Sequence, residues 1–104
     1  MKTINFSYNW NNKLECSAFT TIRLENPSKY VIGDNYQINL KDEPKCTAVI
    51  VDIKPFYLSK INAFMSMIDT GYTPAVCTGI IEKMYSKVDL NVKPLWFILL
   101  AKQK

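Results

Sequence analysis

Two short segments carry side chains that together could bind or transform a small ligand. In the first, Thr21 and Arg23 are two residues apart, so a strand would place the hydroxyl and the guanidinium on one face. A guanidinium offers five N–H donors in a planar fork, which suits a phosphate or the edge of a nucleobase. The other interpretation is that Thr21 is an ordinary strand residue and Arg23 a solvated surface group.

The second segment, Asp69-Thr70-Gly71-Tyr72, brings a carboxylate, a hydroxyl and a phenol to the junction of two predicted helices. Free N–H groups at a helix start add donors to such a junction, and Asp69 is a candidate acid or base. The alternative is that Asp69 caps a turn and that Tyr72 packs at the edge of the core. The candidate ligand-binding residues are therefore Thr21, Arg23, Asp69 and Tyr72, with no catalytic residue assigned.

The lack of histidine limits the chemistry open to this chain. With 0 His among 104 residues, the commonest general base, the commonest metal ligand and every Ser-His or Cys-His pair are missing. Cys16, Cys46 and Cys77 are too widely spaced for a zinc site or a disulfide scaffold. Because phosphate-loop and dinucleotide glycine motifs are also missing, we expect reduced thiols, no metal and no cofactor.

The composition is that of an ordinary folded chain with a mild preference for anionic partners. Hydrophobic residues make up 48% and charged residues 21%, and the net charge is +4. This length and apolar content predict one domain over residues 1–104. No apolar run suits a bilayer and the first residues do not resemble a secretory signal, so we expect a cytoplasmic protein with no membrane partner.

Aromatic residues interleaved with lysines allow two interpretations. They could stack unpaired bases above a basic groove, or they could simply pack the core. The set comprises Tyr8, Trp10, Tyr30, Tyr36, Phe56, Tyr57 and Trp96 with Lys29, Lys54 and Lys60.

Hydrophobic periodicity predicts the strands that must position these groups. Ile4 and Phe6 alternate with polar neighbours, as in a half-buried strand. A final apolar run is too short for a helix and favours a buried central strand. The predicted strands cover residues 3–7, 16–24, 36–41, 46–53 and 95–101, with the third and fourth forming an antiparallel hairpin.

Two helices are predicted between the hairpin and the last strand. Ser59 is a candidate cap for a first helix that buries Ile61, Phe64, Met65 and Ile68 at i, i+3, i+4 and i+7. Gly71 should end this helix, and Thr73-Pro74 should begin the second. The order predicts an α+β fold whose antiparallel sheet curls into a pseudo-barrel with the helices beside it.

Most of the chain, from about Ala18 to Lys102, resembles the small ASCH domains of the PUA-like superfamily, including uncharacterised bacterial and phage members. The resemblance rests on short motifs at matching positions. These are Thr20-Thr21-Ile22-Arg23, Tyr30-Val31-Ile32-Gly33-Asp34, Ile68-Asp69-Thr70-Gly71-Tyr72, Lys83-Met84-Tyr85 and Ile98-Leu99-Leu100.

The resemblance implies a PUA-like pseudo-barrel with a cleft that binds RNA or modified nucleosides. Some ASCH members are amidohydrolases of N4-acylated cytidine and others are ribonucleases. Their catalytic lysine falls on Ala18 here, the threonine on Thr21, and no glutamate stands plainly at the acid position, for which Asp69 is a substitute. Since alanine cannot activate a nucleophile, we expect first a noncatalytic RNA- or nucleobase-binding module.

Two alternatives stay open. One is an amidohydrolase or ribonuclease that uses Thr21 and Asp69 with a lysine from elsewhere, for which Lys54 and Lys60 are candidates. The other is a protein-interaction domain, which an extended exposed apolar patch would favour.

Overall fold

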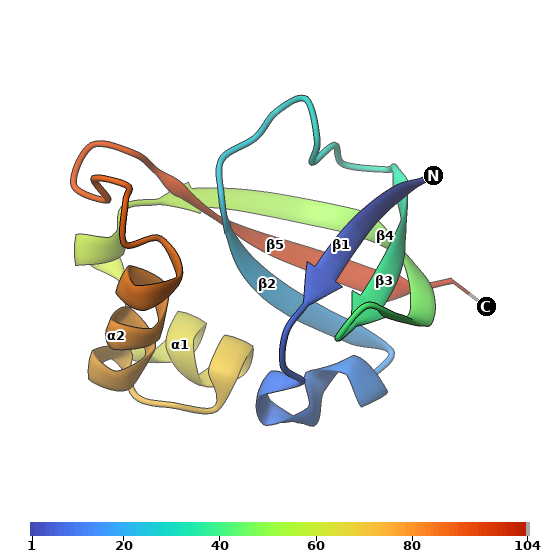
Figure 1. Cartoon of the computed structure of the whole chain (residues 1–104), viewed down its shortest axis with the longest axis horizontal. Helices are drawn as coiled ribbons and strands as arrows, with labels where there is room; N and C mark the ends of the chain where they lie inside the picture. The colour runs from blue at the N-terminus through green and yellow to red at the C-terminus, as the bar shows by residue number, and fades with distance from the viewer. Residues whose placement is uncertain (104) are drawn as a thin grey trace.

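The computed structural model describes residues 1–103 (Figure 1). A five-stranded sheet curls around one part of the core, and two short α-helices lie together at one end of it. The elements in chain order are β1 (Lys2–Phe6), the 3-10 segment η1 (Trp10–Glu15), β2 (Ala18–Leu24), β3 (Asn35–Leu40), β4 (Glu43–Phe56), η2 (Leu58–Lys60), α1 (Ala63–Thr70), α2 (Pro74–Met84) and β5 (Leu95–Lys102).

The sheet is a mixed half-barrel with strand order β1-β3-β4-β5-β2. The α+β class and the position of the two helices between β4 and β5 are confirmed. The prediction of an all-antiparallel sheet is wrong, because β1 pairs with β3 in parallel, with Ile4 opposite Ile38. The chain passes through η1 and β2 before it returns as β3, and this long crossover allows the two strands to run in the same direction.

The predicted hairpin is confirmed, and its turn has a clear local cause. Lys41 and Asp42 adopt left-handed backbone angles, with φ of 51° and 67°, as a two-residue hairpin turn requires. β4 begins earlier and ends later than its apolar segment predicts, since it runs over 14 residues. A register shift between Ile50 and Asp52 accompanies the pairing of this long strand with β5.

β5 is the central strand that its apolar sequence predicts. It pairs with β4 on one side and β2 on the other. Its residues Ile98 and Leu100 pack inside the curl of the sheet, whereas Leu95 joins a second cluster with α2 and the loop that follows it. One strand therefore connects both hydrophobic clusters.

The first helix starts later than predicted and buries a different face. Asn62, rather than Ser59, is the N-cap, and its side chain accepts a hydrogen bond from the backbone N–H of Met65 at 2.9 Å. Phe64 is 72% exposed, whereas Ser66 and Asp69 are buried. The predicted apolar face is thus wrong, because polar contacts to η1 and β2 decide which side of α1 faces inward.

The ends of both helices follow the predicted signals. Gly71 has φ of 79° and ends α1 in the left-handed conformation, and Pro74 is the first residue of α2 after Thr73. Within residues 1–103, neither helix has the length and apolar character needed to cross a membrane.

Candidate functional site

A buried ion pair lies where η1, α1 and β2 meet. Lys13 Nζ donates a hydrogen bond to Asp69 Oδ1 at 2.9 Å, and each residue is only 5% exposed. Thr20 Oγ1 donates to the same carboxylate oxygen, also at 2.9 Å. Both of these hydrogen bonds end on Oδ1, and none from residues 1–103 ends on Oδ2, so Oδ2 retains its accepting capacity.

Burial changes the proton affinity of Lys13. Desolvation lowers the pKa of its ammonium, and the carboxylate of Asp69 opposes this effect without overcoming it. A lysine with a lowered pKa exchanges protons more readily near neutral pH than an exposed lysine does. The site therefore contains an ionisable amine beside a carboxylate.

The turn through η1 explains why Lys13 points inward. Asn11 and Asn12 have φ of 56° and 54°, and asparagine tolerates this left-handed region better than most residues. The side chain of Asn9 accepts a hydrogen bond from the backbone N–H of Leu14 at 2.9 Å, which fixes the turn. These residues turn Lys13 and Leu14 toward the core, where both are buried.

A small pocket of about 60 Å³ brings three of the four candidate residues together. Lys13, Thr21, Arg23 and Asp69 all line it, as does the half-buried indole of Trp10. This volume is far below the roughly 300–1,000 Å³ of typical small-molecule pockets. The pocket thus accommodates one polar edge of a ligand rather than a whole ring system.

Thr21 and Arg23 share a face of β2, and they contact each other directly. Arg23 Nε donates to Thr21 Oγ1 at 2.9 Å, and the terminal nitrogen Nη2 donates to the backbone carbonyl of Asn5 at 2.7 Å. The guanidinium carbon lies 4.8 Å from the centroid of the Phe6 ring. Arg23 therefore connects β2 to β1, the two edge strands of the half-barrel, while it lines the pocket.

Tyr72 lies outside the pocket lining. It is 45% exposed, and its ring meets that of Trp10 edge-on with centroids 6.1 Å apart. Of the four residues predicted to bind a ligand, three line one pocket and the fourth contacts it only through Trp10.

The site lysine is one that sequence reasoning missed. Ala18, where the resemblance places a lysine, is exposed at the start of β2, and Lys13 occupies the site instead. Lys54, suggested as a substitute, is exposed and lies 3.7 Å from Asp52. Lys60 is exposed in η2 and does not line the pocket. The left-handed asparagine pair is the only local signal that a tight turn precedes Lys13, and it does not indicate an inward lysine.

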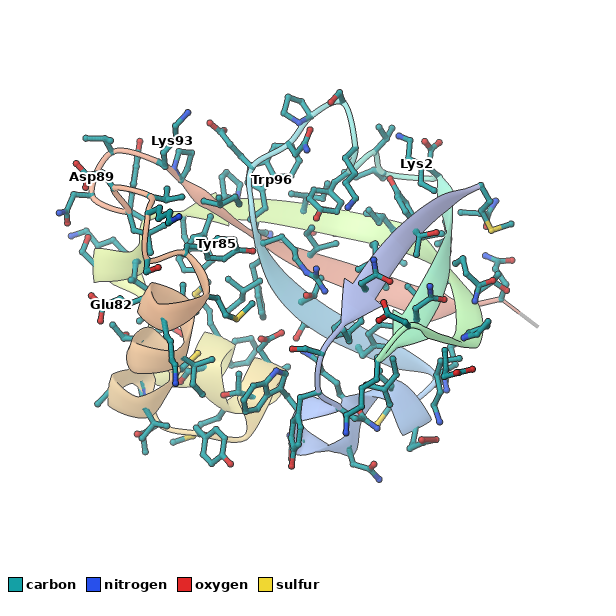
Figure 2. The ribbon with its side chains drawn as sticks, viewed as in Figure 1. Lys2, Glu82, Tyr85, Asp89, Lys93 and Trp96 are labelled. Carbon is teal, nitrogen blue, oxygen red and sulfur yellow. The ribbon has the colours of Figure 1, made fainter. Side chains whose placement is uncertain are left out.

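A larger hollow of about 490 Å³ lies beside the end of α2, where Glu82, Tyr85 and Asp89 line it (Figure 2). Its two carboxylates are exposed. Asp89 already accepts a hydrogen bond from the backbone N–H of Asn91 at 3.0 Å, as a turn residue does. This hollow lacks buried polar groups of the kind that surround Asp69.

An apolar hollow of about 310 Å³ lies between α1 and the outer face of the sheet. Phe64, Ile68, Phe97 and Leu99 form most of its lining. The protein-interaction interpretation would need this apolar surface to extend into an exposed patch of several hundred Å².

No group of three or more Asp, Glu, Cys or His side chains within residues 1–103 is arranged to hold a metal ion. Comparison of the chain with known protein families, with curated proteins and with solved structures gives no match.

Proposed function

We propose that the pocket around Asp69 binds a nucleobase or nucleoside-like ligand, and that the chain is a small RNA- or nucleoside-binding module of the PUA-like, ASCH kind. The observation that carries this proposal is the convergence of Lys13, Thr21, Arg23 and Asp69 on one pocket. The sequence motifs that resemble ASCH domains include three of these residues, and the curled α+β fold is compatible with that family.

The chemistry of the pocket suits the edge of a pyrimidine. A cytosine edge presents an exocyclic amine, and a carboxylate is the side chain that accepts from this amine. Asp69 Oδ2 is available for that role, while the hydroxyl of Thr21 and the ammonium of Lys13 supply donors for a ring carbonyl. The rest of the ring would lie outside the small pocket, against the indole of Trp10.

Calorimetric titration with cytidine and with a short single-stranded RNA tests this proposal. We expect Asp69→Asn and Thr21→Val to weaken binding about 10-fold or more, because a hydrogen bond to a charged group contributes roughly 1.5–3 kcal/mol. Thr47→Val in β4, outside the pocket lining, is the matched control and should bind as the wild type does.

Two results would overturn the proposal. One is a wild-type protein that binds neither cytidine nor RNA at millimolar concentration. The other is an affinity that stays unchanged in both pocket variants, provided that circular dichroism shows them folded.

The second candidate function is hydrolysis of an acylated nucleobase, and the lowered pKa of Lys13 favours it. In this scheme the neutral amine of Lys13 takes a proton from water, and the hydroxide adds to the acyl carbon. The guanidinium of Arg23 stabilises the oxyanion. The C–N bond then breaks, and the proton on Lys13 moves to the leaving nitrogen, which gives a carboxylic acid and the free base.

Incubation with N4-acetylcytidine separates binding from hydrolysis. If hydrolysis occurs, Lys13→Met should abolish turnover, since methionine cannot accept a proton, whereas Lys54→Met at an exposed site should leave turnover unchanged. Equal turnover in wild type and Lys13→Met, or none in wild type, removes this second candidate and leaves the binding proposal intact.

A further inference from the structure

Three aromatic rings form a continuous surface beside the site pocket, which we call the aromatic rim: Tyr8, Trp10 and Tyr72. The rings of Tyr8 and Trp10 are tilted with centroids 4.7 Å apart, and those of Trp10 and Tyr72 meet edge-on at 6.1 Å. Trp10 also lines the pocket that contains Asp69. The rim is thus continuous with the site.

Core packing does not explain the rim. Tyr8 is 52% and Tyr72 is 45% exposed, whereas Tyr30 and Tyr36 are buried at 7% and 0%. Exposed aromatic rings that contact one another next to a pocket are typical of binding surfaces rather than of a monomer core.

The same two segments hold the rim and the buried ion pair. Trp10 and Lys13 both belong to η1, while Asp69 lies in the last turn of α1 and Tyr72 follows that helix directly. The left-handed Gly71 between Asp69 and Tyr72 turns the chain there. Because the ion pair fixes η1 against α1, it also fixes the rings relative to the pocket.

We propose that the two exposed rings of the aromatic rim, Tyr8 and Tyr72, form a second subsite, which stacks the base next to the one bound at Asp69 and against Trp10. This inference rests on the proposed function, and it specifies that the ligand is single-stranded RNA of at least two nucleotides rather than a free nucleoside. Stacking on aromatic side chains suits such a ligand because every base has a flat face. The net charge of +4 favours a ligand that carries phosphates.

The experiment compares cytidine with a dinucleotide and a hexanucleotide that contain cytidine. Stacking contributes about 1–3 kcal/mol per base, which corresponds to roughly a 5- to 150-fold change in affinity. We therefore expect Tyr8→Leu and Tyr72→Leu to weaken binding of the oligonucleotides by at least about 5-fold and to leave cytidine binding unchanged. Leucine keeps apolar volume but lacks the flat face.

Tyr57→Leu is the matched control, because Tyr57 is 46% exposed and lies outside the rim and the pocket lining. A second readout uses the fact that the chain has 2 Trp. In a Trp96→Phe background, Trp10 is the sole indole, and we expect the oligonucleotides to quench its fluorescence further than cytidine does.

The possible outcomes distinguish the two proposals. If cytidine binds in a way that depends on Asp69 but oligonucleotides bind no tighter, the second subsite is wrong and the proposed function stands. If rim variants and Tyr57→Leu behave alike, the subsite is also wrong. If neither cytidine nor RNA depends on Asp69, the proposed function fails and the subsite fails with it.

Discussion

A lysine and an aspartate that are nearly free of solvent contact are the least ordinary residues of this protein. Taking both charges out of water is costly, and their attraction offsets this only because the geometry is close and Thr20 adds a hydrogen bond. Single loss of either partner leaves a buried group without its counter-charge. The pair therefore acts as one unit in folding.

A double-mutant cycle measures this coupling. We expect Asp69→Leu to lower the free energy of unfolding by about 3–5 kcal/mol, because it leaves the buried ammonium of Lys13 without a counter-charge. The double variant with Lys13→Met and Asp69→Leu should recover most of this loss. Urea denaturation of the four proteins gives the values. Simple addition of the two single losses would contradict a coupled pair.

The lowered pKa of Lys13 predicts a pH dependence of stability. In the unfolded chain this lysine has a pKa of about 10.4. In the folded protein its pKa is lower. Between these values the unfolded state binds more protons, so the free energy of unfolding rises with pH through this group. We expect the stability of wild type minus that of Lys13→Met to increase from pH 7 toward pH 10.4.

Urea unfolding at several pH values provides this difference, and the contributions of groups that do not contact Lys13 cancel from it. A difference that stays flat or falls with increasing pH would show that burial does not lower the pKa of Lys13.

At the scale of elements, α1 shows that a helix need not bury its most apolar face. Its buried side carries Ser66, Asp69 and Thr70, and the hydroxyl of Thr70 donates to the carbonyl of Ser66 at 2.8 Å. These groups are satisfied by hydrogen bonds, which removes most of the cost of burying them. Phe64 is left on the surface, where it lines the apolar hollow.

Substitution by alanine should change the free energy of unfolding in opposite directions at Gly71, which precedes α2, and at Gly79, which lies inside it. At Gly71, φ is 79° and a Cβ would lie 3.0 Å from Asn11 Cγ, so Gly71→Ala should lower the free energy of unfolding by about 1–3 kcal/mol. Gly79 lies inside α2, where a Cβ would meet no atom beyond its chain neighbours and the backbone of its own helix, so Gly79→Ala should raise the free energy of unfolding by about 0.5–1 kcal/mol. Thermal melting provides both values, and an equal sign for the two would refute this account.

At the scale of the whole molecule, Arg23 joins the two edges of the half-barrel. The edge strands β1 and β2 are not neighbours in the sheet order, yet the guanidinium of Arg23 spans from one to the other. Exposed edges invite pairing with other chains, and a side-chain bridge is one way to hold them in place. The pocket that Arg23 lines therefore lies beside the contact between the two edge strands of the half-barrel.

Removal of this bridge should loosen β1 in particular. We expect Arg23→Met to lower the free energy of unfolding by about 1.5–3 kcal/mol and to speed amide exchange in β1 more than in β5. Lys45→Met, which removes the exposed ion pair with Glu15, is the control and should change stability by less than about 1 kcal/mol. Uniform acceleration of exchange in both strands would argue against a local bridge.

Elements with local signals could be predicted from the amino-acid sequence. Alternation in β3, the apolar run of β5, the left-handed glycine after α1 and the proline that begins α2 each depend on neighbouring residues only. The shared face of Thr21 and Arg23 follows from strand geometry for the same reason.

Three features could not be predicted in this way: the parallel pairing of β1 with β3, the buried face of α1 and the inward position of Lys13. Each depends on contacts between segments far apart in the chain, such as the 56 residues that separate Lys13 from Asp69. Local propensity carries no information about such a partner, because the free energy of a buried charge depends on which group lies opposite it. The site was therefore determined by an ion pair that no sequence pattern indicates.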